Sequence, residues 1–358
     1  MSVFALCGGG TAGHITPLIA VYEELAKFSP ESECLVIGTL GGRERELLPA
    51  DLQIMASVPK LPFPRRPSTY ALGFVPRFLA TVVRIRRELL ARGVDVVVGF
   101  GGYTAAPVYL AAWLARIPLV VHEANAIPGM ANALASRLTK HVAVCFPGTP
   151  LRHARVVGMP LRRAVIEARE VTPSLARKHF GLATRKPVLL VTGGSTGAQA
   201  INRAIEQSRE LLVSTGWQVL HLIGQDNPVP RDNPAHFHSV GYTDRMDLAL
   251  AAADLVVSRA GAATVSELAV MAKPTVFVPY HVGNGEQAKN AAHAVSVGAA
   301  EVVSNAQFTP QWVSDRLVAL MADSTRRESM SRAMAKIAVL DGAAQVAQMA
   351  IDAAERSD

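Results

Sequence analysis

The chain has 358 residues, of which 50% are hydrophobic, and its formal net charge is +7. This length exceeds one ordinary core, so we expect two domains whose parallel sheets are fully buried. Cys7, Cys34 and Cys145 are odd in number and far apart in apolar surroundings, which excludes a disulfide framework or a cysteine metal site. No cation precedes Lys27, so no secretory signal is evident, and we expect a cytoplasmic protein.

Strands and helices alternate through the first half, which is typical of an α/β fold. We expect strands at 3–7, 34–38, 94–98, 119–122 and 142–145. A helix is expected at 17–27, where Pro17 suits the first turn, and another around 108–115. The uncharged run 96–115 is long enough to span a bilayer, but its glycines and Pro107 indicate a buried strand, a turn and a buried helix.

A glycine turn, residues 8–14, follows the first strand. Glycines allow a sharp turn, and the next helix offers free N–H groups that suit an anion. The glycines match the dinucleotide fingerprint, but Gly38 ends the second strand where an acid is required about 20 positions on, which argues against an oxidoreductase. The helix dipole keeps His14 neutral, so this residue is either a general base or a histidine that only bonds the backbone.

Positive charge is concentrated in residues 60–92, where Glu88 is the only acid. The cations are Lys60, Arg65, Arg66, Arg77, Arg84, Arg86, Arg87 and Arg92, so the segment alone carries +7. Apolar residues from Phe78 to Leu89 recur at helical spacing. Such a segment suits an anionic bilayer surface, where each nearby cation contributes about 1 kcal/mol. The alternatives are a core-packed helix with a solvated basic face, or a nucleic-acid surface, for which no reader motif is evident.

The second half repeats the pattern after a domain boundary near 156–163. We expect strands at 188–192, 219–223, 237–240, 255–258 and 275–278, and only helices from Pro310 onward. Its first strand runs into another glycine turn, 193–198. Two such turns, each opening half of the chain, suggest two nucleotide-binding-type domains that face one another across a cleft.

The second glycine turn has another interpretation, because it also spells the nucleophile elbow of hydrolases. Asp254 and His281 could complete such a triad, but no His-Gly-Gly oxyanion sequence precedes the turn. We therefore interpret Ser195 as a hydroxyl that contacts phosphate at a helix N-terminus.

Two polar stretches follow the later strands. In 258–268, the spacing of Thr264 and Glu267 alone favours a capping box. The Glu267 carboxylate could instead accept both hydroxyls of a ribose. The loop 279–290 is rich in amides and hydroxyls that suit sugar recognition. No D-x-D triplet occurs, which disfavours a glycosyltransferase that holds phosphates through a metal.

Several motifs stand in order along almost the whole chain. They are Gly9-Gly10-Thr11-Ala12-Gly13-His14-Ile15-Thr16-Pro17, His122-Glu123-Ala124-Asn125, Gly193-Gly194-Ser195-Thr196-Gly197-Ala198, Arg259-Ala260-Gly261-Ala262-Ala263-Thr264-Val265-Ser266-Glu267 and Glu286-Gln287-Ala288-Lys289-Asn290-Ala291. Together they resemble the MurG family, the peptidoglycan N-acetylglucosaminyltransferases that convert lipid I to lipid II. The resemblance implies a GT-B architecture of two Rossmann-like, doubly wound domains. They would comprise 1–160, with a C-terminal helix at about 340–358 packed against it, and 161–339.

The resemblance also implies the site residues. Those for UDP-GlcNAc are Thr11, Ala12, Gly13, Asn125, Arg162, Ser195, Thr243, Ala262, Ala263, Thr264, Val265, Ser266, Glu267 and Gln287. Thr243 would offer its backbone to the uracil, Glu267 would take the ribose, and Ser195 with nearby amides would take the diphosphate. Gln287 and Asn125 would hold the sugar. The acceptor's pyrophosphate would lie at Gly101, Gly102, Tyr103 and Thr104.

By the same resemblance the reaction inverts the anomeric carbon, with His14 as the base and with no metal or other cofactor. The enzyme would be peripheral at the cytoplasmic face of the cell membrane, docked through 60–92, with cell-wall and division proteins as partners and no nucleic acid. A UDP-sugar epimerase and a binding module without catalysis remain as rival hypotheses.

Overall fold

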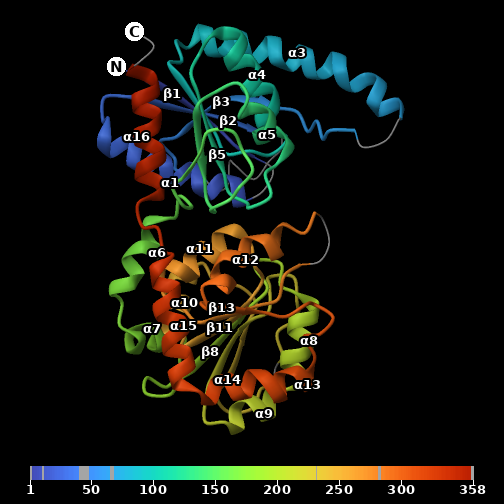
Figure 1. Cartoon of the computed structure of the whole chain (residues 1–358), viewed down its shortest axis with the longest axis vertical. Coiled ribbons are helices and arrows are strands. Elements are labelled where there is room, and N and C mark those ends of the chain that lie inside the picture. Colours follow the sequence, from blue (N-terminus) through green and yellow to red (C-terminus); the bar gives the residue numbers. More distant parts are fainter. Residues whose placement is uncertain are drawn as a thin grey trace. The chain divides into compact units, whose positions relative to one another are not determined.

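The computed structural model describes residues 2–9, 12–39, 48–64, 68–230, 232–280 and 284–355. The chain forms two compact units, unit 1 from Met1–Arg162 with Asp341–Asp358, and unit 2 from Arg163–Leu340 (Figure 1). Residues named in the sequence analysis that lie outside this description are Gly10, Thr11, Arg65, Arg66 and His281, together with the side chain of Ala12.

Unit 1 is built on a seven-stranded parallel sheet in the order β3-β2-β1-β4-β5-β6-β7. The strands are β1 (Val3–Cys7), β2 (Glu33–Thr39), β3 (Gln53–Val58), β4 (Val96–Gly99), β5 (Leu119–Glu123), β6 (His141–Val144) and β7 (Ala154–Val156). The chain winds outward from β1 to β3 and then returns to the other side of β1 as β4. In such sheets, ligands bind beyond the carboxyl ends of the two strands where the order reverses, here β1 and β4.

Helices cover both faces of this sheet. They are α1 (Ala12–Phe28), α3 (Thr69–Ala91), α4 (Ala105–Ala115), α5 (Met130–Ala135) and α16 (Gly342–Glu355). The last of them, α16, brings the chain back to unit 1 and packs beside α1 through small residues such as Ala347 and Ala350 (Figure 1). The expected helix 17–27 begins earlier, at Ala12, so Pro17 lies inside α1 and not in its first turn. That part of the prediction was wrong.

Unit 2 has a six-stranded parallel sheet in the order β10-β9-β8-β11-β12-β13. The strands are β8 (Val188–Thr192), β9 (Gln218–Leu222), β10 (Phe237–Val240), β11 (Leu255–Ser258), β12 (Thr275–Phe277) and β13 (Ala300–Val302). The helices are α6 (Arg163–Glu167), α7 (Pro173–His179), α8 (Gln199–Gln207), α9 (Arg209–Ser214), α10 (Met246–Ala252), α11 (Ala262–Val270), α12 (Glu286–Ser296), α13 (Pro310–Trp312), α14 (Val318–Ala322) and α15 (Ser324–Lys336). The strand order reverses between β8 and β11, which predicts a ligand site at their carboxyl ends.

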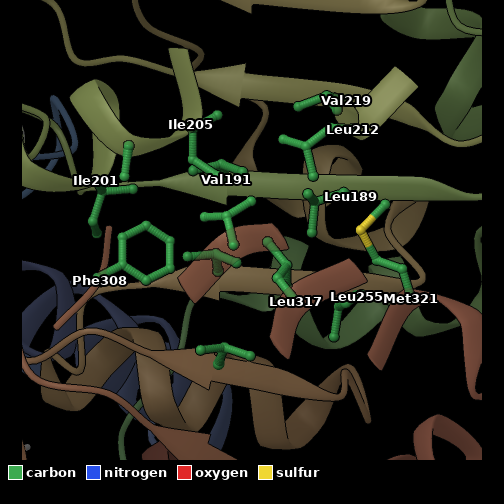
Figure 2. Close-up of a cluster of buried hydrophobic side chains, with 14 of the residues drawn as sticks. Leu189, Val191, Ile201, Ile205, Leu212, Val219, Leu255, Phe308, Leu317 and Met321 are labelled. Carbon is green, nitrogen blue, oxygen red and sulfur yellow. The ribbon is translucent and has the colours of Figure 1, made fainter. Parts of the chain in front are cut away.

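The core of unit 2 fixes the start of α8. Figure 2 shows Val191 of β8 beside Ile201 and Ile205 of α8, and Leu189 of the same strand beside Leu212. Every residue of β8 is buried, because helices cover both faces of a parallel sheet. The turn between β8 and α8 is therefore anchored at both ends by apolar packing.

In the part of the chain that the structure describes, no helix has the length and apolar character needed to cross a membrane. The uncharged run 96–115 consists of β4, a turn and the buried helix α4. The predicted α/β fold of two parallel-sheet units is confirmed.

Candidate functional site

The second glycine turn lies at the carboxyl end of β8, at the reversal of strand order in unit 2. Gly194 and Gly197 have φ values of +87° and +77°, which side-chain-bearing residues rarely adopt. The N–H of Gly197 donates to the Gly194 carbonyl at 2.9 Å, so the turn closes on itself. Ser195 and Thr196 are exposed at its tip, and no side chain caps the start of α8. The arrangement presents main-chain N–H groups and a hydroxyl to an anion.

A second loop, after β9, packs against this turn. A Cβ on Gly197 would overlap the carbonyl of Ile223, and one on Gly224, which has φ of +98°, would overlap the backbone of Gly197. Asn227 Nδ2 donates to the Thr196 carbonyl at 3.0 Å and to the Ile223 carbonyl at 2.9 Å. This support was missed from the sequence, because its members lie far from the turn along the chain.

The capping-box interpretation of Thr264 and Glu267 is wrong. Helix α11 begins at Ala262, with Gly261 as its N-cap in extended conformation and with no side-chain cap. The N–H of Val265 donates to the Gly261 carbonyl at 2.9 Å, so Thr264 is already helical. Glu267 therefore lies one turn inside the helix. Thr264 is not the N-cap, so the capping box that competed with a ligand-binding role for Glu267 does not form.

The start of α11 offers the ligand mainly its backbone. Ala262 and Val265 are buried, and the Ser266 hydroxyl donates to the Ala262 carbonyl at 3.0 Å. Ala263 and Thr264 are partly exposed. The uncapped N–H groups of this first turn form a second positive helix terminus beside the one at α8, because β8 and β11 are neighbours in the sheet.

Side chains of α12 fix the loop before α11. Gln287 Oε1 accepts from the N–H groups of Ala260 at 3.3 Å and Tyr280 at 2.9 Å. The buried Asn290 donates to the Ala260 carbonyl at 3.2 Å. Because the oxygen of Gln287 is bonded to the backbone, a sugar contact from this side chain would use its amide nitrogen.

Arg259, to which the sequence analysis gave no role, also supports this loop. Its Nη1 donates to the Val278 carbonyl and to Asn305 Oδ1, both at 2.8 Å, and its guanidinium lies over the Tyr280 ring. Burial lowers the pKa of Arg259 from its ordinary value.

Two of the residues predicted to bind UDP-GlcNAc lie at the margins of their units. Thr243 follows β10, the outermost strand, and its hydroxyl accepts from the Arg245 N–H at 3.0 Å. Arg162 is exposed at the end of the first segment of unit 1. The Thr243 hydroxyl is thus bonded locally, and the predicted contact between its backbone and the uracil stays a prediction.

In unit 1, His14 lies against the loop after β4. A Cβ on Gly102 would lie 3.5 Å from His14 Nδ1 and 3.4 Å from its Cε1, so the ring rests directly on this glycine. Burial lowers the pKa of His14 from its ordinary value, and a hydrogen bond to the Gly9 carbonyl opposes this shift in part. The imidazole is therefore neutral near pH 7 and can accept a proton. Gly13 beside it is exposed.

The loop after β4 contains the residues predicted to line the acceptor's pyrophosphate. Gly101 and Gly102 have φ values of +84° and +82°, and Tyr103 is partly exposed. Thr104 is fully buried, and its hydroxyl lies 3.0 Å from the hydroxyl of Thr39. Its side chain is thus bonded within the core, and the assignment of this loop to the acceptor stays a prediction.

A buried carboxylate, Glu123, ends β5 beside this loop. It accepts hydrogen bonds from the N–H groups of Asn125 at 2.8 Å and Gly129 at 2.9 Å, and from Asn132 Nδ2 at 2.9 Å. Burial raises the pKa of Glu123, and these donors oppose the shift. Asn125 also bonds Glu123 through its side chain, so the predicted sugar ligand is positioned by the carboxylate. In the sequence, an acidic residue at the end of an apolar strand was the signal that could have identified Glu123.

The neighbouring His122 is fully buried. Its Nε2 lies 3.0 Å from the Gly158 carbonyl and donates to it. No hydrogen-bond partner for Nδ1 lies within the described part of the chain. Burial lowers the pKa of His122 to about 4, so the ring is neutral at physiological pH.

The basic segment forms a helix with two apolar faces. Val82, Ile85 and Leu89 of α3 are buried in the core of unit 1. A second set, which we call the α3 stripe, points away from the core and is 49–82% exposed: Leu72, Val75, Leu79, Val83 and Leu90. Arg86 Nε donates to the Leu114 carbonyl of α4 at 3.4 Å, and Trp113 and Leu114 are also exposed. The outer surface of α3 and α4 is therefore both apolar and basic.

Comparison with known proteins agrees with this architecture. Residues 4–144 match the glycosyltransferase family 28 N-terminal domain, and residues 188–346 match the C-terminal domain of the same family. The chain is 50% identical over 355 residues to the Clavibacter sepedonicus protein called UDP-N-acetylglucosamine--N-acetylmuramyl-(pentapeptide) pyrophosphoryl-undecaprenol N-acetylglucosamine transferase, covering 99% of this chain and 97% of the relative.

Solved structures are similar as well. The crystal structure of Acinetobacter baumannii MurG has a TM-score of 0.79 at 26% identity and covers 98% of this chain and 100% of that one. A UDP-GlcNAc 2-epimerase from Neisseria meningitidis, solved with UDP-GlcNAc, has a TM-score of 0.66 at 14% identity over 98% of this chain and 100% of that one. The second likeness shows only that the fold is shared, so the fold alone does not separate a transferase from an epimerase.

Proposed function

This chain belongs to the MurG family within glycosyltransferase family 28, and from that premise we propose that it transfers N-acetylglucosamine from UDP-GlcNAc to the muramyl 4-hydroxyl of lipid I, giving lipid II. The observation that carries the proposal is the 50% identity, through both units, to a relative named for this transfer. The membership makes the chain an N-acetylglucosaminyltransferase, whereas the epimerase likeness is limited to the fold.

We assign the donor to unit 2. The N–H groups at the starts of α8 and α11, with the Ser195 hydroxyl, would hold the diphosphate and meet the charge that grows on UDP as it leaves. Glu267 would accept the ribose hydroxyls, which its place inside α11 permits. The Thr243 backbone would face the uracil, and the Gln287 amide nitrogen would face the sugar.

We assign proton transfer to His14 in unit 1. One ring nitrogen donates to the Gly9 carbonyl, and a neutral imidazole carries a lone pair on its other nitrogen, to which we assign the proton. The muramyl hydroxyl attacks the anomeric carbon opposite UDP while the carbon–oxygen bond to UDP breaks. The hydroxyl proton passes to His14, UDP leaves with the bonding electron pair, and the new linkage is β. The backbone of Gly101 and Gly102 would contact the acceptor's pyrophosphate.

A lipid-linked acceptor calls for docking at a membrane surface, and we assign this role to α3 and α4 of unit 1. The α3 stripe supplies apolar side chains, and Arg77, Arg86 and Arg87 of the same helix supply positive charge. Arg84 and Arg86 are each partly engaged, since Arg84 Nη2 donates to the Ser57 carbonyl at 2.6 Å and Arg86 Nε to the Leu114 carbonyl at 3.4 Å. Apolar burial and attraction to anionic lipid together account for reversible binding of such a surface.

Incubation of the purified chain with UDP-GlcNAc, with and without a lipid I analogue, tests the function. We expect UDP and a β-linked disaccharide to form in equal amounts, and only when the acceptor is present. Isomerised donor in the absence of acceptor would establish the epimerase instead. Donor binding without a glycosidic product would leave a binding module.

Sedimentation with vesicles containing anionic lipid tests the docking surface. Leu79→Ser with Val83→Ser, and separately the set Arg84→Gln, Arg86→Gln and Arg87→Gln, should weaken binding, the second set by about a hundredfold at low salt if each cation contributes about 1 kcal/mol. Leu175→Ser and Arg332→Gln change exposed residues of unit 2 and serve as controls. Equal binding of all these variants would refute the assignment.

A further inference from the structure

A buried phenol connects helix α4 to the loop after β4. The hydroxyl of Tyr109, a residue only 2% exposed, lies 2.8 Å from Asn132 Oδ1 and 3.2 Å from the N–H of Gly101. Its ring packs so closely on Gly99 that a Cβ on that residue would overlap it. Glycine at the end of β4 therefore makes room for an aromatic ring whose polar atom reaches the loop.

The direction of each hydrogen bond is set by Glu123. A carboxylate only accepts, so the Asn132 amide nitrogen must face Glu123, where it lies 2.9 Å from Oε2. Asn132 Oδ1 then faces Tyr109, and the single phenolic hydrogen must be donated to it. The lone pairs of the Tyr109 oxygen are left to accept from Gly101. We call Tyr109, Asn132 and Glu123 the Tyr109 relay.

The relay joins two loops that follow neighbouring strands. At one end the Glu123 carboxylate binds the N–H groups of Asn125 and Gly129, after β5. At the other end Tyr109 binds Gly101, after β4. Burial raises the pKa of Tyr109 well above its ordinary value, so the phenol keeps the proton that the relay requires.

The position of Gly101 affects the position of His14, the candidate base. Gly101 precedes Gly102, and a Cβ on Gly102 would lie 2.9 Å from the Gly9 carbonyl and 3.5 Å from His14 Nδ1. Gly102 is thus packed between the Gly9 backbone and the imidazole with no space to spare. A shift of the Gly101 amide would move the surface against which the His14 ring lies.

We propose that the Tyr109 hydroxyl is a positioning group for sugar transfer, because it fixes the Gly101–Gly102 backbone against His14 and couples that backbone to the Asn125 loop. This inference rests on the proposed function. Tyr109 touches neither substrate in it and acts through the loop alone. Loss of the hydroxyl would leave the buried Gly101 N–H and Asn132 Oδ1 without their partners.

Tyr109→Phe tests the inference, since it removes one oxygen and keeps the ring on Gly99. The matched control is Tyr22→Phe, in which the lost hydroxyl binds Asp51 at the surface of unit 1. We expect kcat of Tyr109→Phe to fall about five- to thirtyfold, the equivalent of one buried hydrogen bond. KM for UDP-GlcNAc should change less than kcat, because Ser195 and Glu267 lie in unit 2 and the relay reaches the predicted sugar ligand Asn125 only through Glu123.

Hydrogen exchange without substrate gives an independent readout. The peptide that covers 100–104 should exchange faster in Tyr109→Phe than in the parent chain, and at the parental rate in Tyr22→Phe. A Tyr109→Phe enzyme with parental kcat, or with parental exchange in this peptide, would overturn the inference. So would an equal loss of kcat in both variants. An inactive parent chain would instead overturn the proposed function itself.

Discussion

Replacement of His14 by alanine is the sharpest test of the proposed chemistry. A positioned general base accelerates proton transfer by about 10²–10⁴, so the variant should lose about 3–5 kcal/mol of transition-state stabilisation. UDP-GlcNAc affinity should be retained, because we assign the diphosphate, ribose and uracil to groups of unit 2. His14 as a whole residue keeps some solvent exposure, so we expect the unfolding free energy to fall by about 1 kcal/mol.

The pH dependence gives the same test without a mutation. Burial lowers the pKa of His14 from 6.5, and the reactive form is the neutral ring. The value of kcat/KM for the acceptor should therefore be flat above pH 6.5 and fall at lower pH, with an apparent pKa below 6.5. Release of UDP, followed continuously with a lipid I analogue, measures both effects.

Two outcomes would refute the reasoning about His14. The first is turnover of His14→Ala close to the parental rate, which would show that another group or water takes the proton. The second is an equal loss of kcat and of UDP-GlcNAc affinity, which would make His14 a binding residue. An acidic limb centred above pH 6.5 would contradict the burial argument.

Three further predictions concern the donor loops and a core histidine. Glu267→Ala should weaken UDP-GlcNAc binding in calorimetry at least about tenfold, with stability changed by about 0.5 kcal/mol or less, whereas the exposed Glu210→Ala should leave affinity intact; unchanged affinity would remove Glu267 from the site. Gly197→Ala should lower the unfolding free energy measured by urea denaturation by more than about 2 kcal/mol, because its Cβ meets a carbonyl. Gly216→Ala, at φ of +85° in open space, should lower it by about 1 kcal/mol. Equal losses would contradict the packing argument. The pKa of His122 falls from 6.5 to about 4 on folding, so the unfolded chain takes up the proton first. The unfolding free energy should therefore drop by roughly 3 kcal/mol as pH falls between these values. His122→Gln should flatten this pH dependence, and an unaltered slope would refute the role of His122.

The sequence was most informative where the structure is local. An apolar strand that runs into glycines predicts a βα turn at Gly8 and again at Gly193, and in the structure a helix begins at Ala12 and another at Gln199. The alternation of strands and helices predicted the fold class for the same reason. The expected boundary near 160 was read from a basic segment after the last strand, and the structure divides the chain between Arg162 and Arg163.

Local rules failed where a neighbour in space decided the outcome. Thr264 and Glu267 have the spacing of a cap, but Gly261 takes the N-cap position, so the helix begins earlier. Thr104 stands one residue after two glycines, yet its side chain is buried, with its hydroxyl 3.0 Å from that of Thr39 at the end of β2.

The residues that hold the Gly197 and Gly101 loops in place could also not be predicted from local sequence patterns. The contact between Gly197 and Gly224 and the bonds that join Tyr109 to Asn132 and Glu123 depend on which strands are neighbours in the sheets. Spacing along one chain does not encode that order, so these groups could not have been predicted from the sequence alone.

A crystal structure of the chain with bound UDP-GlcNAc would test the central claim most directly. The account predicts both phosphates within hydrogen-bond distance of main-chain N–H groups of Gly194 to Thr196 or of the first turn of α11, with the ribose hydroxyls on Glu267. Phosphates bound away from the carboxyl ends of β8 and β11 would contradict it.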